Sequence, residues 1–104
     1  MGEATRVLRL LANEKRRLVL CQLLLCGERD VTSLAESIGI SLPSTSQHLM
    51  RLRIERLVAV RREAQTAFYR LADPRTTRLL LTLKEIFCDE VSPPVHDLGW
   101  GPRP

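Results

Sequence analysis

The sequence predicts a mainly α-helical protein with one β-hairpin, in the order helix-helix-helix-helix-β-β-helix. Apolar residues follow helical spacing through most of the first half of the chain. The pattern then becomes alternating and β-prone between residues 57 and 71, and Asp73–Pro74 is typical of a new helix start. The 104 residues suit one domain, which we place at residues 1–90. Residues 91–104 are rich in Pro and Gly, and we expect them to form a flexible tail.

The first two helices are predicted from apolar spacing and from capping residues. The first carries apolar residues at helical spacing, namely Val7, Leu8, Leu10 and Leu11. Asn13 and Glu14 are typical of the start of a second helix, and Gly27 is typical of its end. The second helix is apolar on most of its faces, so we expect it to be buried through Leu18, Leu20, Cys21, Leu23, Leu24 and Leu25.

A third and a fourth helix form a predicted helix-turn-helix. Asp30 or Thr32 caps the third helix, which ends at Gly39, where glycine permits a sharp turn. Ser41 caps the fourth helix, and Pro43 lies in its first turn, where a missing N–H group costs nothing. We expect the two helices to pack through Leu34, Ala35, Ile38, Leu49 and Leu52.

The hairpin and the last helix complete the predicted elements. Residues 57–62 and 67–71 are the two strands, and the polar tip at 63–66 lacks the Asn-Gly signal of a tight turn. The last helix starts after Asp73 and runs to about Cys88. Its broad apolar face carries Leu79, Leu80, Leu83, Ile86 and Phe87.

This order of elements is that of a winged helix-turn-helix, and the polar residues fit DNA. The fourth helix starts with short hydrogen-bonding side chains that can reach base edges, namely Ser44, Thr45, Ser46, Gln47 and His48. Arg51 and Arg53 suit backbone phosphates. The hairpin would be the wing, with Arg61, Arg62, Gln65, Thr66 and Arg70. Taken singly, the start of the fourth helix is as typical of capping as of DNA contact. His48 could also be a half-buried packing residue, although DNA contact is slightly favoured, and paired arginines on a hairpin are usually a solvated face.

Composition narrows the possible functions. The net charge of +4 favours a polyanionic partner, and so small a domain buries a thin core that dimerisation commonly supplements. No apolar run is long enough to span a membrane, and residues 1–3 do not begin a signal peptide, so we expect a cytoplasmic protein. The three cysteines do not make a disulfide scaffold. His48, His96 and the cysteines have no nucleophile–base spacing, and no glycine loop could cradle phosphate, so an enzyme is disfavoured.

Several segments resemble the ArsR/SmtB family of repressors. They are residues 11–16, 31–39, 46–49, 52–53, 57–58, 61–66 and 69–74, and the likeness spans roughly residues 5–90. The resemblance implies a symmetric dimer, formed by the first and last helices, that binds an inverted-repeat operator and releases it when an inducer arrives. Metal-sensing relatives carry thiols or histidines in the segments that correspond to 31–34 and 73–79. Those ligands are missing here, so no metal or cofactor is expected.

Residues 13–21 and 83–88 resemble the sulfide- and persulfide-responsive branch of the family (BigR-, SqrR- and HlyU-like proteins). That resemblance implies redox sensing by Cys21 and Cys88, in which a low-molecular-weight persulfide bridges the two thiols and operator affinity falls. Three alternatives stay open: a buried Cys21 that only packs, a repressor that binds arsenite or Cu(I) through Cys21, Cys26 and Cys88, and a dimeric interaction module without sensing. Cys26 has no counterpart in the branch. Arg56 replaces a common glycine, which indicates a phosphate contact or an altered helix end.

Overall fold

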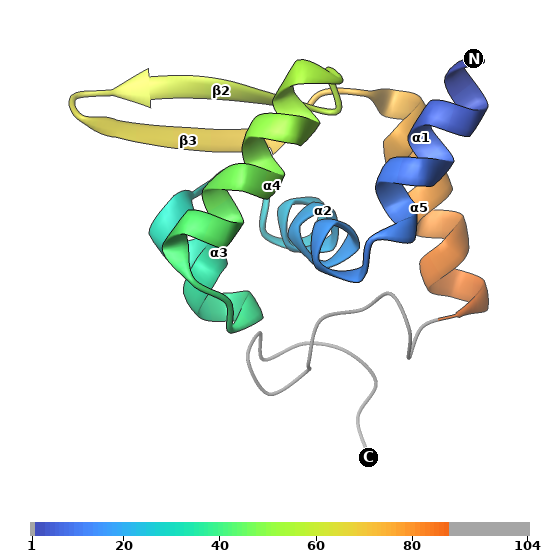
Figure 1. The fold of residues 1–104 in the computed structure, drawn as a ribbon, viewed down its shortest axis with the longest axis horizontal. Helices are drawn as coiled ribbons and strands as arrows, with labels where there is room; N and C mark the ends of the chain where they lie inside the picture. The colour runs from blue at the N-terminus through green and yellow to red at the C-terminus, as the bar shows by residue number, and fades with distance from the viewer. Residues whose placement is uncertain (1, 88–104) are drawn as a thin grey trace.

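The computed structural model describes residues 2–87 and confirms the predicted order of helices and hairpin (Figure 1). The elements are α1 (Glu3–Ala12), α2 (Glu14–Cys26), β1 (Arg29–Asp30), α3 (Val31–Ile38), α4 (Leu42–Ile54), β2 (Val58–Glu63), β3 (Thr66–Leu71) and α5 (Pro74–Ile86). Cys88 and the predicted tail 91–104 lie outside the described residues. None of the described helices is long and apolar enough to cross a membrane.

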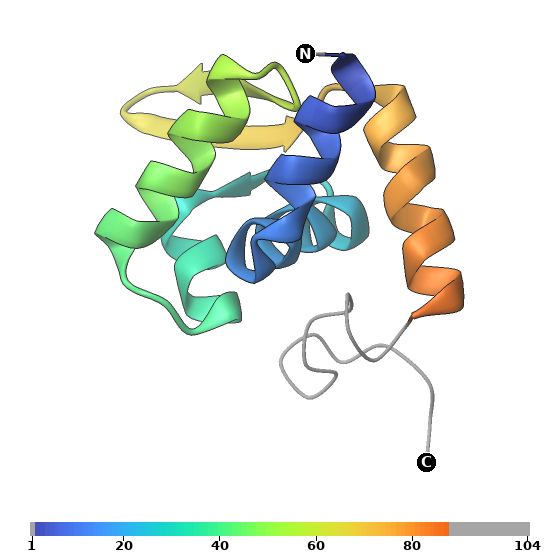
Figure 2. The same ribbon diagram turned by 45° about the vertical axis from the view of Figure 1, so that its right-hand side comes forward.

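Helix α2 occupies the centre of the molecule. Helices α1 and α5 lie side by side on one flank of it, and α3 and α4 lie on the other (Figures 1 and 2). The β2–β3 hairpin projects away from the helices beside α4. This arrangement leaves α4 and the hairpin at one end of the molecule and the α1–α5 pair at the other.

Four side-chain caps set the helix starts, because each satisfies an N–H group that has no partner inside its helix. Asn13 accepts from the Arg16 N–H at 3.0 Å, and Ser41 accepts from the Ser44 N–H at 3.2 Å. Asp73 accepts from the Arg75 N–H at 3.0 Å. The third helix is capped by Asp30, whose carboxylate accepts from the Ser33 N–H and hydroxyl at 3.4 and 2.6 Å. These caps confirm the predicted starts and decide between Asp30 and Thr32.

The sheet contains a strand that the sequence did not predict. Its order is β1-β3-β2, and the two-residue β1 pairs Arg29 with Tyr69 and Asp30 with Phe68. The hairpin strands also extend further than predicted, since Glu63 pairs with Thr66 and leaves only Ala64 and Gln65 in the turn. Ala64 has a φ of 55°, the left-handed conformation in which Asn or Gly is more common.

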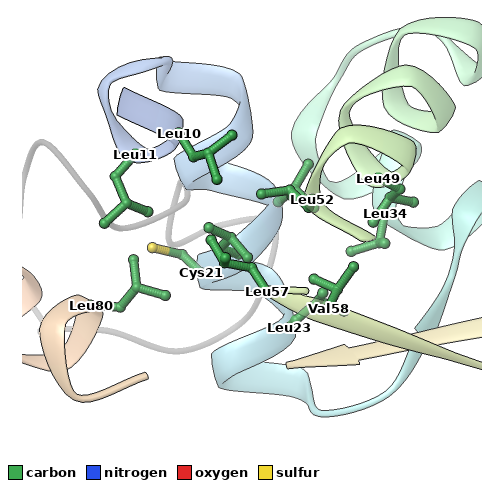
Figure 3. Close-up of a cluster of buried hydrophobic side chains, with 12 residues drawn as sticks. Leu10, Leu11, Cys21, Leu23, Leu34, Leu49, Leu52, Leu57, Val58 and Leu80 are labelled. Atoms are coloured by element: carbon green, nitrogen blue, oxygen red, sulfur yellow. The ribbon is translucent and has the colours of Figure 1, made fainter. Parts of the chain in front are cut away.

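The core surrounds α2 and joins both flanks of the molecule (Figure 3). Leu34, Leu49 and Leu52 point inward as predicted, whereas Ile38 is only half-buried. One predicted core face needs correction. Leu18, Leu24 and Leu25 are half-buried while Val19 and Gln22 are fully buried, because the neighbours of α2 cover only part of its surface. On α1 and α5, four large apolar side chains are exposed by about half or more: Leu8 (55%), Leu81 (51%), Ile86 (63%) and Phe87 (49%).

Arg56 ends α4 in a left-handed conformation, with a φ of 67°. The Arg56 N–H donates to the Arg53 carbonyl at 3.0 Å, and the Leu57 N–H donates to the Leu52 carbonyl at 2.9 Å. Leu52 and Leu57 are both buried. This pattern is a Schellman motif, and its left-handed position usually holds glycine because a Cβ atom is disfavoured there. The structure thus gives a physical reason why glycine would suit position 56.

Replacing Arg56 by glycine is therefore expected to stabilise the protein, raising the free energy of unfolding by about 1 kcal/mol. Urea unfolding followed by circular dichroism measures the change. Arg53→Gly is the matched control, because residue 53 lies inside α4, where glycine costs about 1 kcal/mol. A loss of stability in Arg56→Gly would contradict the strain at this position.

Candidate DNA-binding surface and thiol site

The first turns of α4 present the polar side chains predicted to contact bases. Ser46 and Gln47 are exposed, and Ser44 and His48 are half-buried. Thr45 differs, because it is fully buried and its hydroxyl donates to the Ser41 carbonyl at 2.8 Å. The structure therefore places Thr45 in the core and not on the surface predicted for it. Successive residues of a helix point in different directions around its axis, so the five consecutive polar residues 44–48 cannot all lie on one face.

His48 is half-buried on α4 and close enough to Arg16 of α2 for that charge to act on it. Burial, and to a smaller extent the nearby Arg16 charge, lowers its pKa below the ordinary value of 6.5. The imidazole is therefore neutral at neutral pH, with one ring nitrogen as donor and the other as acceptor. In this state His48 offers hydrogen bonds and no charge.

Two arginines extend the polar surface along α4. Arg51 and Arg53 are both exposed in the last turns of the helix. Arg51 is 3.8 Å from Glu55, from its Nε atom to Oε2, which is a loose pair at a spacing of four residues. Such exposed pairs contribute little stability, so both guanidinium groups remain able to exchange partners.

The hairpin carries the predicted wing residues, and all five side chains are exposed: Arg61, Arg62, Gln65, Thr66 and Arg70. Arg61 is nevertheless engaged within the protein. Its Nη2 lies 2.7 Å from Glu28 Oε1, its Nε lies 3.1 Å from both oxygens of that carboxylate, and its guanidinium stacks 4.9 Å from the Phe68 ring centroid. The hydrogen bond from Arg61 lowers the pKa of Glu28. Arg61 thus ties the hairpin to the turn after α2. Within residues 2–87, Arg62 and Arg70 have no comparable hydrogen bond, although the Arg70 charge also lowers the pKa of Glu28.

The described cysteines have contrasting environments. Cys21 is fully buried in α2, and its sulfur lies between Leu11 of α1 and Leu80 of α5 (Figure 3). Burial raises the pKa of the Cys21 thiol to about 11, against opposing effects of Arg17 and Lys84. Cys26 is exposed at the end of α2, where its thiol donates to Gln22 Oε1 at 3.5 Å. Because thiolates are the reactive form, burial and the raised pKa disfavour reaction of Cys21 in this conformation.

No group of three potential metal ligands is close enough to hold an ion within residues 2–87, and Cys88 lies outside that range. The sequence had indicated neither the Glu28–Arg61 pair nor the burial of Thr45. The opposite charges of residues 28 and 61 could have indicated this pair only if the hairpin were already known to fold back onto the turn after α2.

Comparison with known proteins identifies the family. Residues 13–60 match the model of the bacterial regulatory protein, arsR family. The transcriptional activator HlyU of Vibrio cholerae is 37% identical over 87 residues, which cover 84% of this chain and 80% of HlyU. The biofilm growth-associated repressor of Agrobacterium fabrum is 40% identical and covers 83% of this chain and 73% of its own.

Solved structures agree with this assignment. Reduced HlyU matches with a TM-score of 0.77 at 38% identity and covers 82% of this chain and 88% of its own. The repressor BigR from Xylella fastidiosa also matches with a TM-score of 0.77, at 36% identity, covering 83% and 87%. The homodimeric winged helix-turn-helix DNA-binding domain Mb0332 from Mycobacterium bovis matches at 0.68, at 37% identity, covering 84% and 79%. The chain belongs to the arsR family of bacterial regulatory proteins, and it is a transcriptional regulator with a winged helix-turn-helix fold.

Proposed function

We propose that this protein is a repressor that binds an inverted-repeat operator as a homodimer and releases it when a persulfide bridges Cys21 and Cys88. The observation that carries the proposal is the position of Cys21, whose sulfur lies between α1 and α5 (Figure 3). These are the helices with the exposed apolar side chains, so the thiol lies directly beneath the candidate dimer surface. Since operator DNA lies in the cytoplasm, the protein would act there.

The homodimer is argued from the α1–α5 face. Leu8, Leu81, Ile86 and Phe87 are exposed there, and an apolar hollow of about 350 Å³ separates the two helices near Val7 and Leu79. Exposed apolar side chains on two neighbouring helices, together with an apolar hollow between them, are typical of a protein–protein interface. The homodimeric state of Mb0332, a relative of the same fold, supports a second copy of the chain as the partner.

In the proposed complex, α4 of each protomer enters the major groove. Ser46 and Gln47 would contact base edges, with Ser44 and His48 beside them, while Arg51 and Arg53 hold phosphates. Arg62, Gln65, Thr66 and Arg70 of the wing would contact the adjacent backbone or minor groove. Because the dimer is symmetric, the two recognition helices must sit about 34 Å apart to match the two half-sites.

The sensing chemistry is thiol–persulfide exchange in two balanced steps. A thiolate attacks the outer sulfur of the persulfide R–S–SH, releases the thiol RSH and becomes a protein persulfide. The second cysteine then attacks the inner sulfur of that persulfide, which releases H₂S and closes a disulfide. The raised pKa of Cys21 favours Cys88 as the first acceptor and leaves Cys21 to close the bridge.

Helix geometry indicates how a bridge would act on DNA binding. Leu80 packs near the Cys21 sulfur, and the Lys84 charge reaches the same thiol. Cys88 follows Lys84 by four residues in the sequence; it comes after the end of α5 at Ile86 and lies outside the described residues. A bridge would tie the end of α5 to α2 beneath the dimer surface, change the spacing of the two α4 helices and weaken operator binding.

A gel-shift titration with glutathione persulfide tests the proposal. We expect the wild-type protein to lose operator affinity at least about tenfold, a change of about 1.4 kcal/mol, with intact mass showing a Cys21–Cys88 crosslink. Cys21→Ala and Cys88→Ser should bind the operator and ignore the persulfide, whereas the control Cys26→Ser should respond as the wild type. Two results would overturn persulfide sensing. One is normal release of the operator by a variant that carries both Cys21→Ala and Cys88→Ser. The other is release of the operator from the wild-type protein by arsenite or Cu(I) and not by persulfide.

A further inference from the structure

We propose that a hollow lined by arginines beside the recognition helix binds a phosphate group. The arginine hollow is formed by α1, the first turn of α2 and the last turns of α4, and its volume is about 250 Å³. Its lining residues are Arg6, Arg9, Leu10, Arg16, Arg51 and Glu55. None of its α1 and α2 residues belongs to the surface predicted to contact DNA.

The hollow holds more positive charge than its own carboxylate can balance. Arg6 Nη1 donates to both the Glu55 carbonyl and Glu55 Oε1, each at 2.9 Å, so the single carboxylate is already engaged. Arg51 reaches that carboxylate only at 3.8 Å. Arg9 makes no hydrogen bond or ion pair with any part of the chain that the structure describes, and it is exposed. Four guanidinium groups therefore meet one carboxylate.

The geometry of these groups favours phosphate over a singly charged anion. Guanidinium groups donate two parallel hydrogen bonds to phosphate oxygens, and several can share one dianion. Arg16 Nε donates to the Leu10 carbonyl at 3.0 Å, which holds this side chain against α1 and beside the hollow. Arg16 also lies in the first turn of α2, where the helix dipole adds positive potential.

The position of the hollow allows two sources of phosphate. Arg51 follows Gln47 by one helical turn on α4, so the hollow borders the exposed face of that helix. A backbone phosphate of the operator is one source, which rests on the DNA binding proposed above. Inorganic phosphate or a phosphorylated small molecule is the other source, and its binding requires no DNA. A common set of variants distinguishes them.

Arg9→Gln is the test variant, because Arg9 has no bonds within the described chain whose loss would disturb folding. Arg78→Gln is the control, since it removes the same charge from an exposed position on α5. In the first arm, inorganic phosphate is titrated into each protein at constant ionic strength while NMR follows the arginine Nε–H and α1 amide signals. In the second arm, binding to operator and to unrelated duplex DNA is measured over a salt series.

A DNA source predicts that Arg9→Gln weakens binding to both duplexes and reduces the slope of log K against log salt by about 1, while Arg78→Gln changes neither. A free phosphate source predicts saturable shifts at Arg6, Arg9 and Arg16 that Arg9→Gln weakens several-fold, with operator binding unchanged. Either result supports the site. Unsaturable shifts together with an unchanged salt slope would overturn it. If the protein bound no DNA at all, the phosphate titration would still decide whether the arginine hollow binds phosphate.

Discussion

Replacing Gln47 by alanine is expected to weaken operator binding by about 1–3 kcal/mol, which corresponds to roughly a 5- to 150-fold rise in Kd. Gln47 is exposed in the second turn of α4, and its amide can form two hydrogen bonds with one base edge. Truncation leaves that base edge desolvated and without its partner. The loss should therefore appear on the operator and be much smaller on unrelated DNA, where phosphate contacts dominate.

Fluorescence anisotropy with operator and unrelated duplexes measures both affinities at one salt concentration. Gln65→Ala is the matched control, because it removes the same amide from the turn of the wing, where backbone contact is proposed. Thermal unfolding of both variants checks that the fold is intact. Equal losses on both duplexes would show that Gln47 contacts phosphate and does not read sequence.

Stability is expected to fall by about 2–3 kcal/mol between pH 9 and pH 11 because of Cys21 alone. Burial raises the pKa of this thiol from 9.0 to about 11 in the folded protein. Below pH 9 the thiol is protonated in both states, so its contribution is constant. Between the two pKa values the unfolded chain loses the proton while the folded protein keeps it, which favours unfolding. The contribution is lost fully above the folded pKa.

Urea unfolding at intervals from pH 8 to pH 11 tests this prediction, with Cys21→Ala as the comparison. The alanine variant starts less stable because a buried side chain is shortened, but the gap to wild type should close as the pH rises. All other titrating groups are shared, so the difference between the two curves isolates Cys21. Parallel curves would mean that the thiol has an ordinary pKa and is accessible to reaction.

The prediction also bears on the proposed sensor. If the thiol ionises only near pH 11, the bridge at neutral pH depends on rare exposure of Cys21 or on movement of α5 away from it. Leu11 and Leu80 lie on either side of the sulfur, so opening must disturb the α1–α5 pair (Figure 3). Sensing and the dimer surface are in this way coupled through the same packing.

Much of the fold was predictable because its signals are local. Asn13, Ser41 and Asp73 cap helices through atoms two or three residues away, and the left-handed Gly39 ends α3. The missed strand β1 is two charged residues long, which is too short for an alternating pattern. It exists only because β3 offers a free edge to residues 29 and 30.

By itself, the sequence determined the order of the helices and the hairpin, the helix starts and the polar character of α4 and the hairpin, since each depends on neighbours within about one helical turn. It also determined the family, through motifs spread along the chain. Only the tertiary structure decided which residues of that winged helix-turn-helix are available. Thr45 is buried, Arg61 is held by Glu28, Cys21 is desolvated beneath α1 and α5, and Arg6 and Arg16 border a hollow beside α4. The physical reason is common to all four cases. Burial, pKa and pairing are set by side chains far apart in the chain, and folding alone brings those side chains together.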